Sequence, residues 1–168
     1  TEGTPVAIGS GGKTANIAWD PNDATKILAA YRDNSGELHA RICQVSGTTI
    51  TLQAVTTIDA GSNNDYIGVA ADPYVANRYV VSYNQDGNKG MVRTMRVTGS
   101  AGSWTIVGSP YYQFDTGSTI VSCNVIFTTG KRFIVTYEDS SSRGKAREGA
   151  LSGTTTGSPA YYTVTGWD

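Results

Sequence analysis

The chain has 168 residues and a formal net charge of −1, and 39% of its residues are hydrophobic. The length suits a single domain that buries its own core, and the near-neutral charge excludes a strongly basic surface for nucleic acid or anionic membranes. No apolar run is long enough to predict a membrane span. Cys43 and Cys123 lie far apart in the sequence and His39 is the only histidine, so no metal site, no cofactor and no disulfide framework are expected.

The composition predicts a β protein. The chain has 20 Gly and 10 Tyr, and Thr and Val are abundant whereas Leu is scarce, which is typical of strands joined by many turns. No window shows apolar residues at the three-and-four spacing of an amphipathic helix. We therefore expect an all-β chain with essentially no helix.

A unit of about 52 residues occurs three times along the chain. The pair Asp20-Pro21 returns as Asp72-Pro73, and three sets of single residues recur at nearly the same interval. These sets are Tyr31, Tyr83 and Tyr137; Arg41, Arg93 and Arg147; and Gly47, Gly99 and Gly153. Repetition at such a period indicates an array of equivalent structural units. The repeats cover approximately residues 9–60, 61–114 and 115–168 of one domain, residues 1–168.

Turn residues divide each unit into four strands. In the first unit the expected strands are 15–19, 26–31, 38–45 and 49–55, with a polar hairpin at 33–36. The second strand is apolar or small at odd and even positions alike in all three units, which predicts cover on both of its faces. The fourth strands of the other units are expected at 104–107 and 161–164.

A four-stranded antiparallel sheet of this size, covered on both faces, matches one blade of a β-propeller. The expected fold is therefore three tandem propeller-like blades, with a β-sandwich as the alternative. Known propellers begin at about four blades, so either the chain is part of a longer polypeptide or protomers combine to close a ring. Residues 3–6 resemble residues 108–111, so the chain is expected to begin with the end of a blade.

The first unit, GTPVAIGSGGKTANIAWDPNDATKILAAYRDNSGELHARICQVSGTTI, resembles the propeller-like repeats of tail-fibre and other virion appendage proteins of marine bacteriophages. The resemblance is strongest in residues 3–52, good in 60–114 and weaker in 115–168, where the Asp-Pro pair is missing. It implies a virion structural protein, namely a fibre, appendage or capsid-decorating module of the extracellular particle. The implied partners are other virion proteins or further copies of the chain, and binding of a host-surface glycan stays open.

Contact residues are expected among the aromatic side chains near turns and on last strands, because Tyr and Trp bury a large area at small entropic cost. These candidates are Tyr66, Tyr74, Trp104, Tyr111, Tyr112, Tyr161, Tyr162 and Trp167. The repeated tyrosines and arginines are expected to be structural, as a Tyr-to-Arg or Arg-to-Asp lock inside each blade. A ring of sugar-binding groups is the alternative for them.

No catalytic motif stands out in the sequence. His39 has no counterpart in the other two units and is expected to face solvent, and the serines lack the glycine pattern of a nucleophile elbow. Cys123 has no base near it in sequence. We therefore expect a protein that is not an enzyme, and the alternative function is a soluble β-propeller lectin.

Overall fold

The computed structural model describes residues 2–10, 12, 14–62, 64–86, 89–115, 119–152 and 163–167. These residues form fourteen β-strands and no helix, so the all-β prediction is confirmed. The strands are β1 (Ala15–Trp19), β2 (Lys26–Arg32), β3 (Leu38–Ser46), β4 (Thr49–Leu52), β5 (Thr56–Asp59), β6 (Asp65–Ala71), β7 (Arg78–Gln85), β8 (Lys89–Thr98), β9 (Thr105–Gly108), β10 (Tyr112–Asp115), β11 (Ile120–Phe127), β12 (Arg132–Asp139), β13 (Gly144–Ser152) and β14 (Thr163–Trp167).

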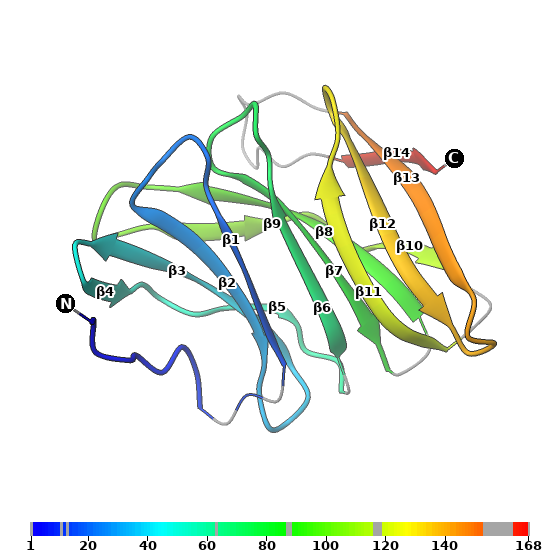
Figure 1. Cartoon of the computed structure of the whole chain (residues 1–168), viewed down its shortest axis with the longest axis horizontal. Helices are drawn as coiled ribbons and strands as arrows, with labels where there is room; N and C mark the ends of the chain where they lie inside the picture. The colour runs from blue at the N-terminus through cyan, green and yellow to red at the C-terminus, as the bar shows by residue number, and fades with distance from the viewer. Residues whose placement is uncertain are drawn as a thin grey trace.

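The strands form three antiparallel sheets that follow one another along the chain (Figure 1). Sheet A contains β1–β5, sheet B contains β6–β10 and sheet C contains β11–β14. Within each sheet the first three strands are joined by hairpins and lie in chain order. The prediction of three antiparallel sheets, one for each repeat, is therefore confirmed.

The fourth strand predicted at 104–107 matches β9, whereas the one predicted at 49–55 ends at Leu52, and each of sheets A and B has an additional outer strand, β5 or β10, that the sequence did not predict. In sheet A, β4 pairs with the second half of β3 and β5 pairs with its first half. In sheet B, β9 and β10 divide β8 in the same way. The break in sheet B contains Pro110, which lacks the N–H that a ladder hydrogen bond needs. The outer strand of each of these sheets is therefore two short segments with a bend between them.

Aspartate side chains close the turns that the Asp-Pro pairs predict. The Asp20 carboxylate accepts a hydrogen bond of 2.9 Å from the backbone N–H of Asn22. The Asp72 carboxylate accepts one of 2.7 Å from the N–H of Tyr74. Both aspartates are buried, so these bonds satisfy carboxylate oxygens that water does not reach.

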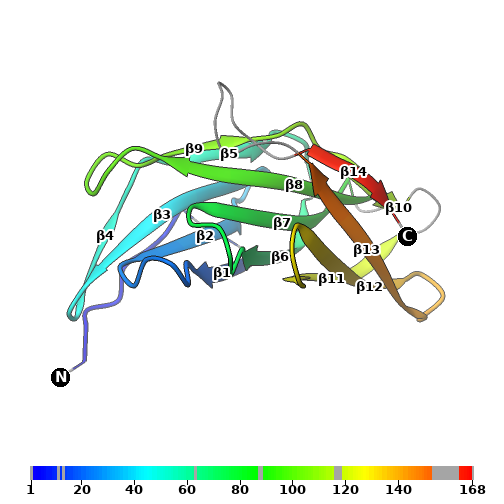
Figure 2. The same ribbon diagram turned by 90° about the horizontal axis from the view of Figure 1, so that it is seen from above.

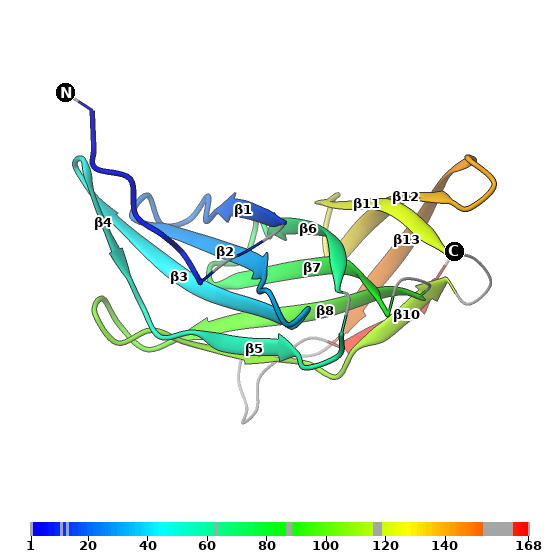
Figure 3. The ribbon, with the colours of Figure 1, turned by 90° about the horizontal axis from the view of Figure 1, so that it is seen from below.

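The sheets pack face to face, and their first strands β1, β6 and β11 lie side by side along one edge of the molecule (Figures 2 and 3). We call the face of a sheet that carries its repeated tyrosine the tyrosine face, and the other one the opposite face. The opposite face of sheet A packs on the tyrosine face of sheet B, and the opposite face of sheet B packs on the tyrosine face of sheet C. The first core includes Leu28, Ala30, Ile42, Tyr79, Val81, Tyr83 and Met95, and the second includes Val80, Val92, Phe114, Phe133, Val135 and Tyr137.

Cover on both faces of the second strands holds for β2 and β7 but not for β12. In β12 buried and more exposed residues alternate, because no described residue of the chain covers the opposite face of sheet C. Sheet A is also terminal, yet an N-terminal segment, described at residues 7–10, 12 and 14, lies on its tyrosine face. A Cβ atom at Gly9 would come within 2.2 Å of the Tyr31 ring, and the backbone N–H of Arg32 donates to the carbonyl of Thr14.

Candidate functional site

The repeated tyrosines connect neighbouring sheets. The Tyr83 hydroxyl donates a hydrogen bond of 2.8 Å to Asp59 at the end of β5 in sheet A, and Tyr137 makes the equivalent bond to Asp115 at the end of β10 in sheet B. Burial and then the nearby carboxylate raise the pKa of both phenols, that of Tyr137 to about 12. For Tyr83 and Tyr137 the hydrogen-bond partner is thus an aspartate of the preceding sheet and not, as expected, an arginine of the same blade.

The repeated arginines hold the broken outer strands. Arg41 Nε donates to the carbonyl of Gln53 at 3.1 Å, and Arg93 Nε donates to that of Ser109 at 2.7 Å. Both carbonyls belong to the bend between the two outer segments of the same sheet. Arg147 donates across to the carbonyl of Phe114 in sheet B. Side chains committed to backbone carbonyls in this way stabilise the fold.

The tyrosine face of sheet A is more exposed than that of sheet B. The N-terminal segment covers the part around Tyr31, where Arg41 Nη1 donates to the carbonyl of Ile8 at 2.9 Å. The part around β1 is open, since Ile17 is 60% exposed and Trp19 is 47% exposed. Val69, the equivalent of Ile17 in sheet B, is buried. Ile17 and Trp19 therefore form an exposed apolar patch on this face, which is a candidate interaction surface.

The opposite face of sheet C is open as well, and it is more polar. Ile126 is 56% exposed there, next to Thr136 and an ion pair of 3.4 Å between Arg132 and Glu148. A shallow hollow of about 750 Å³ lies across this sheet between β11 and the start of β13. The described residues therefore leave one open face of each kind, part of the tyrosine face of sheet A and the opposite face of sheet C.

The predicted contact aromatics are divided between surface and core. Tyr66, Tyr74 and Tyr111 are exposed, on β6, on the β6–β7 turn and in the break between β9 and β10. Tyr112 is half-buried against the second core. Tyr161, Tyr162 and the side chain of Trp167 lie outside the described residues.

The prediction that Trp104 is a contact residue is wrong. Trp104 is 7% exposed and belongs to the core between sheets A and B. The Lys26 ammonium of sheet A lies 4.7 Å from its ring centroid, which is a cation–π contact across the two sheets.

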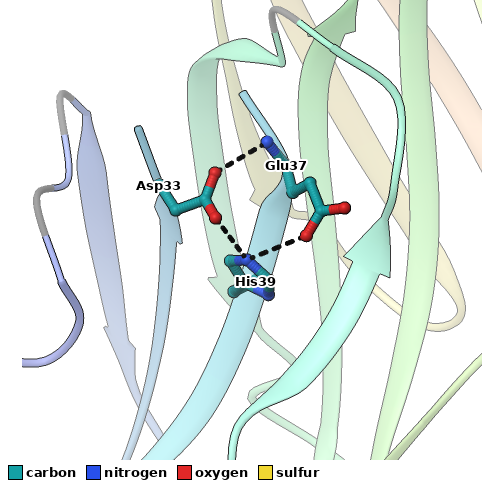
Figure 4. A group of neighbouring side chains, drawn as sticks. All are labelled: Asp33, Glu37 and His39. Atoms are coloured by element: carbon teal, nitrogen blue, oxygen red, sulfur yellow. Dashed lines mark hydrogen bonds and ion pairs between the residues drawn. The ribbon is translucent and has the colours of Figure 1, made fainter. Parts of the chain in front are cut away.

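A polar cluster lies at the β2–β3 hairpin of sheet A and unites Asp33, Glu37 and His39 (Figure 4). His39 Nε2 lies 3.2 Å from Asp33 Oδ2 and 3.6 Å from Glu37 Oε2. The His39 side chain is 12% exposed and lines an open cavity on the outer face of sheet A, so it is half-buried at the surface. A hydrogen bond from Ser35, followed by the contact with His39, lowers the pKa of Asp33 to about 2, which keeps its carboxylate ionised at neutral pH.

The equivalent hairpin of sheet C also carries an aspartate, but its neighbours there are cationic. Asp139, the counterpart of Asp33, is paired with Lys145 at 2.9 Å and with Arg143 at 3.1 Å. These cations take the places of His39 and Glu37 in the repeat. The sequence analysis does not predict the cluster in sheet A. The signal for it is the position of Asp33, Glu37 and His39 on the two sides of one tight hairpin.

Both cysteines carry free thiols. Cys43 lies in sheet A and Cys123 in sheet C, and burial raises the pKa of each thiol, that of Cys123 to about 12. Neither sulfur is a thiolate nucleophile at neutral pH.

Among the described residues no helix is long and apolar enough to cross a membrane. Comparison with protein-family models, with curated protein sequences and with solved structures finds no match to this chain. Its own residues and geometry are therefore the basis for inferring its function.

Proposed function

We propose that the chain is a non-enzymatic structural module of a bacteriophage virion, in a fibre, an appendage or a capsid decoration. In this proposal it works by packing its two open sheet faces against further sheets of the same kind. The observation that carries the proposal is the apolar tyrosine face of sheet A, where Ile17 and Trp19 are exposed. The resemblance of residues 3–52 to virion appendage repeats supplies the setting.

The internal interfaces indicate what covers the open faces. Each of them joins an opposite face to the tyrosine face of the next sheet, and the described residues leave one open face of each kind. A second copy brings its sheet C to the sheet A of the first, which continues the same order of faces. Such a head-to-tail contact closes into a ring or extends as a filament, depending on the rotation between copies.

The three sheets are, in this proposal, three blades of a propeller-like array. The support is that the first strands of all three sheets lie along one edge while the outer segments lie along the other (Figures 2 and 3). Two chains then supply six blades. Full burial of Trp19 and Ile17 would contribute about 2 kcal/mol for each side chain.

A soluble lectin with sugar sites between the blades is the competing function. The two differ in what the outer faces do, because a lectin needs several equivalent sugar sites, whereas a structural module needs large protein contacts. The exposed Tyr66, Tyr74 and Tyr111 all belong to sheet B, so they offer no site that is repeated in all three units. Glycan binding, where it occurs, is secondary to assembly.

The test is to place a charge on each open face and measure the assembly mass by native mass spectrometry. We expect Trp19→Glu and Ile126→Glu each to reduce the assembly to monomers, and an equimolar mixture of the two variants to form dimers only, since one intact face of each kind remains. Tyr74→Glu is the matched control, because it removes an exposed aromatic outside both faces. Assemblies that survive both face variants would refute the proposal.

A further inference from the structure

We propose that Asp33, Glu37 and His39 form a binding site for a divalent transition-metal ion such as Zn²⁺. The site lies at the β2–β3 hairpin, on the tyrosine face of sheet A, where the His39 ring lies 5.5 Å from the Tyr31 ring. It uses neither Ile17 nor Trp19, and it adds a ligand to a chain whose sequence alone indicates none.

The donor atoms have the spacing that a small metal ion requires. Zn²⁺ binds imidazole nitrogen and carboxylate oxygen at about 2.0–2.2 Å, which separates neighbouring donors by about 3.0–3.5 Å. His39 Nε2 lies 3.2 Å from Asp33 Oδ2 and 3.6 Å from Glu37 Oε2, and all three donors fit within 4.8 Å. Small side-chain adjustments therefore bring all three onto one ion.

The orientation of the imidazole ring favours the same role. The Thr57 hydroxyl lies 3.3 Å from His39 Nδ1, on the far side of the ring from the carboxylates. With the ion bound, Nδ1–H would donate to this hydroxyl and the Nε2 lone pair would face the metal. Metal-binding histidines commonly donate their other ring N–H to a hydrogen-bond acceptor in this way.

The repeat provides an internal comparison of charge. In sheet C the equivalent aspartate, Asp139, is paired with Lys145 and Arg143. In sheet A these positions hold His39 and Glu37, so the cluster has two carboxylates and neither lysine nor arginine at these positions. A bound cation would balance this charge in sheet A.

The surroundings leave room for the ion and its water ligands. An open cavity of about 430 Å³ is lined by Tyr31, Asp33, His39 and Arg41. The Arg41 guanidinium also lines this cavity, and it donates to the carbonyls of Gln53 and Ile8. An imidazole nitrogen among the donors favours Zn²⁺, Co²⁺, Ni²⁺ or Cu²⁺ over Mg²⁺ and Ca²⁺.

The experiment is calorimetric titration of the chelator-treated chain with Zn²⁺. We expect one ion per chain, and we expect the affinity to fall about 10- to 100-fold in His39→Lys and in Glu37→Gln. His39→Lys copies the arrangement of sheet C, so it also removes the rise in melting temperature that Zn²⁺ produces. Asp139→Asn is the matched control and leaves the affinity unchanged.

A second measurement separates this site from the cysteine thiols. Because His39 is the only histidine, its ring nitrogens give an unambiguous NMR signal, and we expect Zn²⁺ to shift Nε2 far more than Nδ1. Absence of binding at millimolar Zn²⁺ would overturn the proposal. Binding that His39→Lys does not weaken would overturn it too, since the thiols would then be the ligands.

Discussion

The tyrosine faces of sheets A and B carry equivalent residues but have different surroundings. In sheet B, Tyr79, Val81 and Tyr83 are buried against sheet A, and Asp59 accepts the hydrogen bond of the Tyr83 hydroxyl. In sheet A, among the described residues, only 7–10, 12 and 14 lie over part of the same face, and Trp19 is exposed. Each of the three repeats forms a sheet with an equivalent tyrosine face. The tyrosine face of the terminal sheet A has no neighbouring sheet, and the described residues do not cover all of it.

The opposite faces of sheets B and C show the same contrast at glycine positions. A Cβ atom at Gly68 would lie 2.5 Å from Ser82 Oγ and 2.8 Å from the Cα atom of Asn124 in sheet C. A Cβ atom at Gly144, on the open face of sheet C, would meet no atom within 4 Å. Glycine at 68 is therefore required by the close approach of two sheets, whereas glycine at 144 is not.

The largest expected change in stability comes from adding a methyl group at the close approach of sheets B and C. Gly68→Ala pushes β6 away from the backbone of β11 and should lower the free energy of unfolding by about 2–3 kcal/mol, as overpacking does. Gly144→Ala should change it by less than about 0.5 kcal/mol. Chemical denaturation of both variants at concentrations where the chain is monomeric measures the difference. Equal costs would mean that sheets B and C do not approach as closely as described.

A smaller effect distinguishes the two tyrosine faces. Tyr83→Phe removes a buried hydrogen bond to a carboxylate and should cost about 1.5–3 kcal/mol. Tyr31→Phe should cost less than about 0.5 kcal/mol, because no described residue plays the part of Asp59 beside Tyr31. The measurement is again the free energy of unfolding. A cost for Tyr31→Phe as large as that for Tyr83→Phe would show that the outer face is already locked.

The smallest effect is a pH dependence at the interface of sheets B and C. The pKa of Tyr137 is raised from 10.0 to about 12 in the folded chain, so its contribution to stability is complete below about pH 10 and is lost as the pH rises through 12. We expect the free energy of unfolding to fall between pH 10 and 12, and to fall less steeply in Tyr137→Phe. Identical slopes for the two proteins would show that the phenol is not held by Asp115.

The strands and turns were predictable because they depend on local residues. Alternation, Asp-Pro pairs and the period placed the three hairpin-connected strands of each sheet correctly. The burial of Trp104 was not predictable, because it depends on Lys26 and the core of another sheet, 78 positions earlier in the chain. Pro110 in the sequence indicates that β9 ends before it, but it does not show that a further outer strand, β10, begins after it.

The polar partners across sheets were the least predictable feature. Tyr83 and Asp59 lie 24 positions apart, and nothing in their separation shows that the aspartate ends an outer strand of the preceding sheet. The cluster of Asp33, Glu37 and His39 is local to one hairpin. Its contrast with Asp139 and the two cations there depends on the equivalent register of sheets A and C, which the sequence of one hairpin does not show.

The most direct test of the assembly claim is sedimentation velocity on the unmodified chain at micromolar concentration. We expect species heavier than the 17.7 kDa chain, with a dissociation that Trp19→Glu promotes and Tyr74→Glu does not. A stable monomer over the whole range, with Ile17 and Trp19 still exposed, would contradict both the cover of the terminal faces by a second copy and the virion role inferred from it.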